Sequence, residues 1–288
     1  MTTAAAEHWN RVDNSGRVNW WSSSKCQSYY NQALCGEAAL TGGSQGVRRR
    51  LAKDFPGRVF ERAVSIGCGP AAKELALIAD GLVGHFDLYE IAQTRIDQGR
   101  KAAEALGLLD RITHRSGDVF GAERKPEYDL VYWDHSLHHM SDVDDALAWS
   151  KAVLKPGGVI VINDYVGPNR LQWTPTEVAR ANAFLAESAV RRGVPVRKLH
   201  RSNILSWLKM YRRDPSEAPQ SERILAAAQR HLPGVKFEPV GGTFLNILGG
   251  VVVPLVTEDS PVIDEMLAAD RQLLNEGSAH FTFAIWSA

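Results

Sequence analysis

Two glycines after the first expected strand could hold a small ligand. Gly67 and Gly69 follow the apolar run 63–66. Two glycines at a strand's carboxyl end let the backbone turn tightly and approach a ligand without Cβ clashes. The helix expected at 70–79 would offer free N–H groups and a partial positive charge at its start. Taken alone, such a glycine pair is also typical of a plain tight turn.

The next two strand ends carry acidic residues. Glu90 follows Gly67 by 23 residues, the spacing at which an acidic side chain accepts hydrogen bonds from a ribose diol. Asp118 could accept from an adenine amino group while Val119 packs on the ring, and Ile91 follows Glu90 at the same edge. Each acidic residue alone could be a solvated strand end. Together with the glycines they predict a nucleoside pocket along the carboxyl edge of the sheet.

The segment after the fourth strand is rich in histidine. His135 or His139 could act as a general base because a neutral imidazole accepts protons near pH 7, and Asp134 precedes them at the strand tip. The alternative is that these residues only start the next connection and pack on the sheet. A metal site from His135, His138, His139 and Asp134 is also conceivable. We expect none, because a short loop rarely supplies all the convergent ligands that a metal needs.

Aromatic residues indicate where a second molecule could bind. They come from the stretch before residue 60 and from the segment after the fifth strand. If they meet near Asp134 and Asp164, the pocket would suit an amine or another cation. The alternative is that they bury the N-terminal helices on the sheet. The residues expected to bind the substrate are Trp21, Tyr29, Tyr30, Tyr165 and Trp173.

Short apolar runs alternate with helical segments from residue 62 onward. This alternation predicts βαβ units and a parallel sheet, so the fold class is α/β and doubly wound. The expected strands are 63–66, 85–89, 112–115, 128–133, 159–162, 235–239 and 280–286, with a turn at 155–158. The expected helices are 24–40, 44–55, 70–79, 92–106, 141–154, 174–192, 203–213, 221–231 and 262–275.

Two helical regions lie outside the alternation. Residues 1–60 show no strand pattern and are expected to form a helical N-terminal cover, followed by one domain at 61–288. Residues 174–231 are expected to form a helical insertion on the substrate side, before the last two strands. Thr174, with Pro175 and Glu177 after it, is typical of a helix start, and Ser141 is expected to cap another helix.

The composition excludes several classes of protein. Lys and Arg number 33 against 33 Asp and Glu, and the sequence pI is about 7.1. This balance disfavours a nucleic-acid partner, which usually requires a strongly basic domain. The hydrophobic fraction of 44% excludes a disordered chain, and no apolar run is long enough for a membrane span. The start of the sequence has no signal-peptide pattern, and the three cysteines suggest no disulfide framework, so we expect a cytoplasmic location.

These motifs, in this order, resemble the class I S-adenosylmethionine-dependent methyltransferases. The resemblance covers roughly 62–165 and includes the stretch Leu154-Lys155-Pro156-Gly157-Gly158. It implies a mostly parallel, seven-stranded Rossmann-like sheet whose final antiparallel strand is 280–286. It also implies S-adenosyl-L-methionine as the cofactor. The residues that would bind it are Gly67, Gly69, Glu90, Ile91, Asp118, Val119 and Asp134.

The sequence therefore predicts methyl transfer to a nitrogen, oxygen or sulfur atom of a small molecule, in a specialised metabolite pathway. One alternative is an NAD(P)-dependent oxidoreductase, since Gly67, Gly69 and Ala72 also satisfy G-x-G-x-x-A. The other is a non-catalytic, cofactor-binding partner subunit. The identity of the acceptor and the formation of a homodimer stay open.

Overall fold

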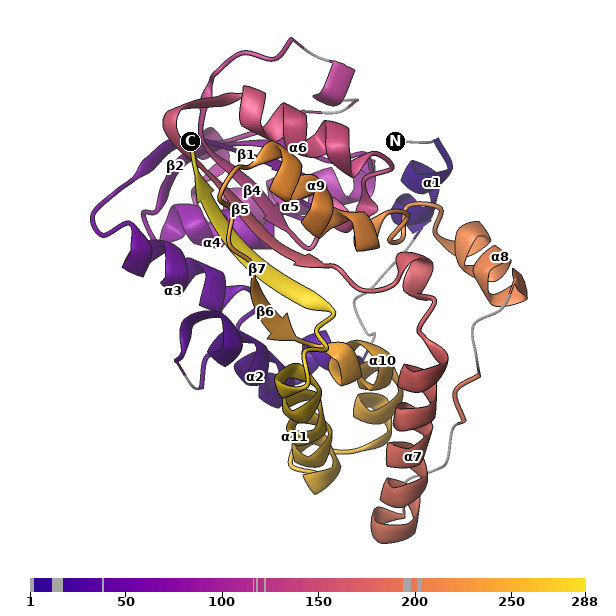
Figure 1. The fold of residues 1–288 in the computed structure, drawn as a ribbon. Helices are drawn as coiled ribbons and strands as arrows, with labels where there is room; N and C mark the ends of the chain where they lie inside the picture. The colour runs from indigo at the N-terminus through magenta and orange to yellow at the C-terminus, as the bar shows by residue number, and fades with distance from the viewer. Residues whose placement is uncertain are drawn as a thin grey trace.

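A seven-stranded sheet forms the centre of the molecule (Figure 1). The structure, a computed structural model, describes residues 3–11, 18–37, 39–115, 117, 119–121, 123–193, 198–200 and 204–288. The strand order is β3-β2-β1-β4-β5-β7-β6, and β1 to β5 run parallel. The strands are β1 Phe60–Ile66, β2 Val83–Tyr89, β3 Ile112–Arg115, β4 Tyr128–Asp134, β5 Leu154–Tyr165, β6 Glu238–Gly241 and β7 Phe281–Ser287.

The position of β7 confirms the expected doubly wound sheet. This strand lies between β5 and β6 and runs antiparallel to both. The dinucleotide-binding sheet of nicotinamide enzymes has the order 3-2-1-4-5-6, with no such inserted strand. The strand order therefore favours the methyltransferase prediction over the oxidoreductase alternative.

Helices cover both faces of the sheet (Figure 1). Alternate strand residues point to opposite faces, so Val131 and Trp133 pack with α6 and α9, whereas Leu130 and Tyr132 pack in the larger core on the other face. The helices are α1 Thr3–Arg11, α2 Ser24–Cys35, α3 Gln45–Asp54, α4 Ala72–Ala79, α5 Gln93–Ala105, α6 Val143–Ala152, α7 Pro175–Arg192, α8 Ile204–Arg213, α9 Ile224–His231, α10 Thr243–Val252 and α11 Pro261–Asn275.

Several expected boundaries were wrong for local reasons. Helix α2 ends at Cys35, five residues before the expected end, because Gly36 at its C-cap has a φ of +79°. Helix α6 is capped by Asp142, which accepts the N–H of Asp145 at 3.0 Å, rather than by Ser141. Residues 155–158 form a bulge inside β5 and not a separate turn, because pairing with β4 continues on both sides of them.

The last part of the chain also differs from expectation. Strand β6 begins three residues later than predicted. Helix α10 was missed because Gly249 and Gly250 interrupt its apolar sequence. A Cβ on Gly249 would lie 2.7 Å from the Trp20 side chain, so this glycine permits close packing. Helix α1 was also missed, and Asn203, the expected start of α8, lies outside the described residues.

A buried carboxylate holds the start of α10. Asp270 of α11 has no exposed surface and accepts the N–H groups of Gly242 (2.8 Å), Phe244 (2.6 Å) and Leu245 (3.2 Å). It also accepts the Tyr29 hydroxyl at 2.6 Å. Gly242 has no side chain with which to cap the helix, so Asp270 supplies the missing acceptor.

We expect Asp270→Asn to lower the free energy of unfolding by about 2–4 kcal/mol, because the amide nitrogen would face donors that need an acceptor. Urea unfolding followed by circular dichroism measures this change. Asp264→Asn is the matched control on the same helix. Asp264 is largely exposed and, within the described ranges, forms an ion pair with Lys25 alone, so its replacement should change stability by less than about 1 kcal/mol. Equal losses for the two variants would contradict the capping role of Asp270.

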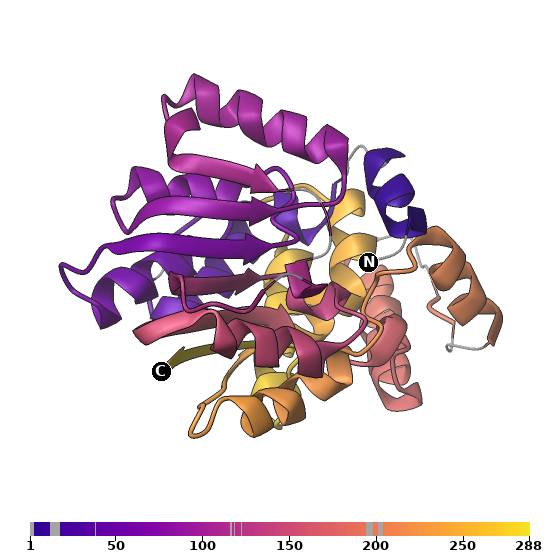
Figure 2. The same cartoon turned by 90° about the horizontal axis from the view of Figure 1, so that it is seen from above.

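The carboxyl ends of the parallel strands face α1 and α8. In Figure 2 the arrowheads of the first strands point toward the side on which these two helices lie. This edge is where open α/β sheets bind ligands. None of the helices in the described part of the chain has the length and apolar character that a membrane crossing requires.

Candidate active site

The glycine turn after β1 is tied to the end of β2 by Glu90. Gly67 and Gly69 have φ angles of +69° and +59°, a region that favours glycine. One Glu90 oxygen accepts the N–H of Gly69 at 2.8 Å, and the other accepts those of Ile91 and Ala92, also at 2.8 Å. A carboxylate has about four lone-pair sites, so Glu90 retains capacity for a ligand hydroxyl while it fixes the loop.

Two cavities meet at Glu90 and Ile91. The first is small and mostly apolar, and Val119 and Gly117 lie in its wall. The second lies over the glycine turn. Asp118, the expected adenine partner, lies outside the described residues. The other residues of the first cavity are Ile66, Tyr89 and Phe120. Along the joined cavities, an apolar compartment is therefore followed by the Glu90 carboxylate and then by the backbone of the glycine turn.

A third cavity of about 450 Å³ continues from the second. Five side chains line both of them: Trp9, Lys73, Arg95, His135 and His139. The remaining walls of the third cavity are largely aromatic and polar. They include Trp20, Trp21, His138, Tyr165, Glu217, Asn246 and Phe281. We call this third space the histidine cavity. Two adjoining compartments with shared walls could hold two reactants side by side.

Two cations stand between the glycine turn and the histidine cavity. Lys73 donates to the Asp134 carbonyl and lies 3.5 Å from an Asp134 carboxylate oxygen. The Arg95 guanidinium lies 4.5 Å from the centre of the Trp9 ring, and its Nε is buried without a hydrogen-bond partner. Burial lowers the pKa of Arg95, and among the described residues no carboxylate forms an ion pair with it. Lys73 and Arg95 could therefore bind an anionic group of a ligand.

His135 lies at the junction of the two spaces. Its φ of +57° is unusual for a residue other than glycine and turns the chain sharply after β4. Its Nε2 atom lies 3.3 Å from the Asn163 amide nitrogen, and its ring contacts Trp21 edge to face at 4.5 Å. Burial is the main cause that lowers the pKa of His135 to about 4. The ring is therefore neutral at pH 7 and is a weak base.

Asp164 organises the turn that follows β4. This fully buried carboxylate accepts the N–H groups of Ser136 (3.0 Å), Leu137 (2.7 Å) and Tyr165 (2.7 Å) and the Nδ1–H of His138 (2.5 Å). Desolvation opposes its ionisation, but the His138 charge and these donors outweigh it and lower the pKa of Asp164 to about 2.

The pKa values of His138 and His139 shift in opposite directions. Burial opposes the protonation of His138, yet the Asp164 charge outweighs it and raises the pKa of His138. Burial and the charge of His138 lower the pKa of His139. His138 was not among the expected bases, whereas His135 and His139 were. A sequence reading could have favoured His138 only by pairing it with Asp164 on the adjacent strand.

Asp134 lies beside the cavities and does not line them. Its carboxylate has almost no exposed surface and accepts the Tyr132 hydroxyl at 2.6 Å and the Asn163 amide at 2.8 Å. Desolvation opposes its ionisation, but Lys73 and His135 outweigh it and lower the pKa of Asp134. This arrangement suits the fixing of neighbouring side chains better than direct contact with a ligand.

The expected substrate residues divide into two groups. Trp21 and Tyr165 line the histidine cavity. Tyr30 lies one layer deeper, with its hydroxyl 2.8 Å from Asn163 and its ring 5.7 Å from that of His135. Tyr29 is engaged with Asp270, and Trp173 packs against the core outside the cavity walls. The structure therefore does not bring Tyr29 and Trp173 to the site.

The sequence interpretation missed several cavity residues. Lys73 could have been found from its place in the first turn of the helix after the glycine turn. Trp9, Arg95, Glu217 and Phe281 come from distant segments, and no local motif marks them. Only folding of the chain brings them to one edge of the sheet.

The matches of this chain to sequence families and curated proteins include methyltransferases. The family model described as a methyltransferase domain matches residues 63–158. The chain is 26% identical over 170 residues to an uncharacterized 37.1 kDa protein of transposon TN4556 from Streptomyces fradiae, covering 57% of this chain and 48% of that one. It is 28% identical over 121 residues to 27-O-demethylrifamycin SV methyltransferase from Amycolatopsis mediterranei, covering 41% and 43%. The chain thus spans less than half the length of these two relatives.

Solved structures share the fold. Geranyl diphosphate C-methyltransferase from Streptomyces coelicolor superposes with a TM-score of 0.59 at 14% identity, covering 99% of this chain and 98% of that one. Phosphoethanolamine N-methyltransferase 2 from Haemonchus contortus gives a TM-score of 0.53 at 13% identity, covering 100% and 60%. At these identities the likeness extends to the fold alone.

Proposed function

We propose that the chain, whose residues 63–158 match a methyltransferase domain, is a class I S-adenosylmethionine-dependent methyltransferase that moves the methyl group of its cofactor to a heteroatom of a small molecule. The observation that carries this proposal is the line of three adjoining cavities along the carboxyl edge of the sheet. Two of them have the polarity pattern of the cofactor, and the third opens where a methyl acceptor would lie.

The cofactor would lie across the first two cavities. Its adenine would pack on Val119 in the apolar cavity, and Glu90 would accept from a ribose hydroxyl. The methionine part would pass over Gly67 and Gly69, where the absence of side chains allows close approach. Its carboxylate would meet Arg95 and Lys73, whose charges have the sign that this group requires.

The acceptor would lie in the histidine cavity, beyond His135. In the transfer, a lone pair of the heteroatom forms a bond to the methyl carbon while the carbon–sulfur bond breaks. The electron pair of that bond remains on sulfur, which gives S-adenosylhomocysteine. The main task of the protein is to hold the two reactants in line and exclude water. The aromatic walls formed by the exposed Trp21 and by the buried Tyr165 and Phe281 support this role.

The expected division of the chain is consistent with this proposal. Residues 1–60 contribute Trp9 and Trp21 to the histidine cavity, and residues 174–231 contribute Glu217. We therefore propose that these two helical regions select the acceptor, whereas the domain at 61–288, apart from its insertion at 174–231, supplies the cofactor site. A place in a specialised metabolite pathway belongs to the same proposal.

Isothermal titration tests the cofactor directly. We expect one molecule of S-adenosylhomocysteine to bind per chain with a Kd of about 1–100 μM, equivalent to about −8 to −5 kcal/mol. NAD and NADP, titrated in parallel, should give no heat of binding. Binding of NAD(P) without binding of S-adenosylhomocysteine would overturn the proposal.

The same preparation tests catalysis. We expect methyl-labelled S-adenosylmethionine to label at least one acceptor in a panel of small hydroxyl, amine and thiol compounds. Tight cofactor binding with no labelled product in a broad panel would instead favour the partner-subunit alternative.

A further inference from the structure

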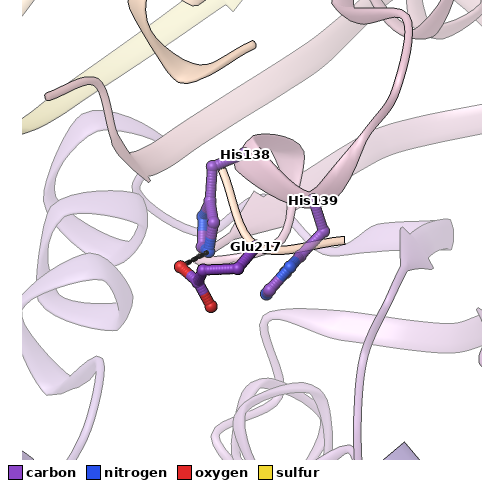
Figure 3. Close-up of side chains that lie close together, drawn as sticks. All are labelled: His138, His139 and Glu217. Atoms are coloured by element: carbon purple, nitrogen blue, oxygen red, sulfur yellow. Dashed lines mark ion pairs between the residues drawn. The ribbon is translucent and has the colours of Figure 1, made fainter. Parts of the chain in front are cut away.

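Two histidines and a glutamate converge on one wall of the histidine cavity. Among the described residues, His138, His139 and Glu217 form the one group of three metal-ligating side chains whose ligand atoms all lie within 4.8 Å of one another. Figure 3 shows both rings directed toward the Glu217 carboxylate. The two histidines belong to the turn after β4, and Glu217 comes from the segment between α8 and α9.

We propose that His138, His139 and Glu217 bind a divalent first-row transition-metal ion. Two imidazoles and one carboxylate are a donor set that zinc, iron and related ions accept, whereas magnesium and calcium prefer oxygen donors alone. Three protein ligands leave at least one coordination position for another molecule. That position would face the histidine cavity, because all three side chains line it.

Contacts behind the histidines orient them for this role. The Nδ1–H of His138 donates to Asp164 at 2.5 Å, and the Nδ1–H of His139 donates to the Ser216 carbonyl at 3.0 Å. In each ring this leaves Nε2 as the free ligand atom. Metal-binding histidines almost always have such a partner on the second nitrogen, and it fixes both the tautomer and the ring orientation.

The three ligand atoms need to move only slightly closer together to bind a metal ion. Nε2 of His138 lies 3.9 Å from the nearest Glu217 oxygen. Around a zinc ion with bonds of about 2.0–2.2 Å, ligand atoms lie about 3–3.5 Å apart. Glu217 is partly exposed, so its side chain has room to move. The alternative is that protonated His138 and Glu217 form only an ion pair. In that case the cluster would bind no metal ion with a stoichiometry of one.

A metal ion at this cluster would restrict the class of methyl acceptor, and this step rests on the proposed function. An oxygen atom of the acceptor could occupy the open position. Coordination lowers the pKa of a bound hydroxyl, so its proton passes to solvent and the oxygen attacks the methyl carbon as an anion. The expected acceptor class is therefore a hydroxyl compound, with a second donor atom favouring chelation. His135, whose pKa is about 4, is not needed as a base in this scheme.

Metal titration of the chelator-treated full chain tests the site without any acceptor. We expect Zn²⁺ and Co²⁺ to bind with a stoichiometry of one, and bound Co²⁺ to show the intensified visible absorption of a site with low coordination number. Glu217→Gln and His139→Gln should each weaken the binding at least about tenfold. Glu222→Gln, the same change at a glutamate that lines none of the cavities, should leave metal affinity unchanged.

Titration with S-adenosylhomocysteine separates the two proposals. Glu217→Gln should bind it as the original chain does, which shows that this variant is folded, because Glu217 lines the histidine cavity and not the second cavity. Absence of stoichiometric metal binding by the original chain, or equal metal affinity in Glu217→Gln, would overturn the metal site even if the cofactor binds. If the chain bound metal in a way that depends on Glu217 but bound no cofactor, the metal site would be supported and the proposed function would be rejected.

Discussion

Glu90→Gln is expected to weaken the binding of S-adenosylhomocysteine roughly 100-fold, because two or more charge-assisted hydrogen bonds of about 1.5–3 kcal/mol each are affected. The carboxylate holds the N–H of Gly69 on one side and those of Ile91 and Ala92 on the other. An amide would turn its own N–H₂ group toward one of these donors. The loop would lose its anchor, and the ribose would lose its acceptor.

Glu74→Gln is a matched control for this change. Glu74 is also buried and lies in the first turn of α4, but it lines none of the three cavities. Among the described residues, the one hydrogen-bond donor to its carboxylate is the Ser65 hydroxyl, at 2.7 Å. Burial raises the pKa of Glu74, so a neutral amide should be tolerated there. Isothermal titration of both variants, with melting temperatures to monitor folding, makes the comparison. If Glu90→Gln retained the original affinity, the cofactor could not lie where we propose.

Asp164→Asn is expected to lower methyl transfer by roughly 10²–10⁴-fold, on the pattern of other histidine–aspartate pairs in which loss of the carboxylate leaves the wrong tautomer. Asparagine can accept with one oxygen only, so the Nδ1–H of His138 would compete with three backbone N–H groups. The proton would move to Nε2, where it blocks both proton acceptance and metal coordination. Binding of Zn²⁺ should therefore weaken in parallel with activity.

This prediction distinguishes an effect on chemistry from an effect on cofactor binding. The hydrogen bonds that Asp164 accepts from described residues come from the turn after β4 and from Tyr165, not from the glycine turn, so the affinity for S-adenosylhomocysteine should change by less than about fivefold, or 1 kcal/mol. Asp129→Asn is the matched control on the neighbouring strand. Asp129 binds Arg62 and Lys155 at the opposite edge of the sheet, far from the cavities. A parallel loss of cofactor binding and activity in Asp164→Asn would show that the whole turn had collapsed.

Local sequence was sufficient to predict several residues that line the first two cavities, where we propose that the cofactor binds. Gly67, Gly69, Glu90 and Val119 follow strands that are consecutive in the chain, and the carboxyl ends of parallel strands meet at one edge. Their roles depend on backbone geometry close to each residue. For this reason the order of short motifs indicated both the parallel sheet and a pocket along its carboxyl edge.

The acceptor half could not be predicted in the same way. His138 had no distinguishing local feature, and its raised pKa comes from Asp164, which is 26 residues away in the chain. Tyr29 was grouped with Tyr30 because they are adjacent in sequence. On a helix, adjacent residues point in different directions, and Tyr29 contacts Asp270 whereas Tyr30 contacts Asn163.

The sequence by itself determined the fold class, the parallel strands and the glycine turn with Glu90, because these features depend on periodicity and on residues near one another in the chain. Only the tertiary structure brought His139 and Glu217 into one cluster and separated Tyr29 from the cavity. The physical reason is that an imidazole or carboxylate acquires its charge state and direction from the groups packed around it. In this protein those groups come from β5, from the segment between α8 and α9, and from α11.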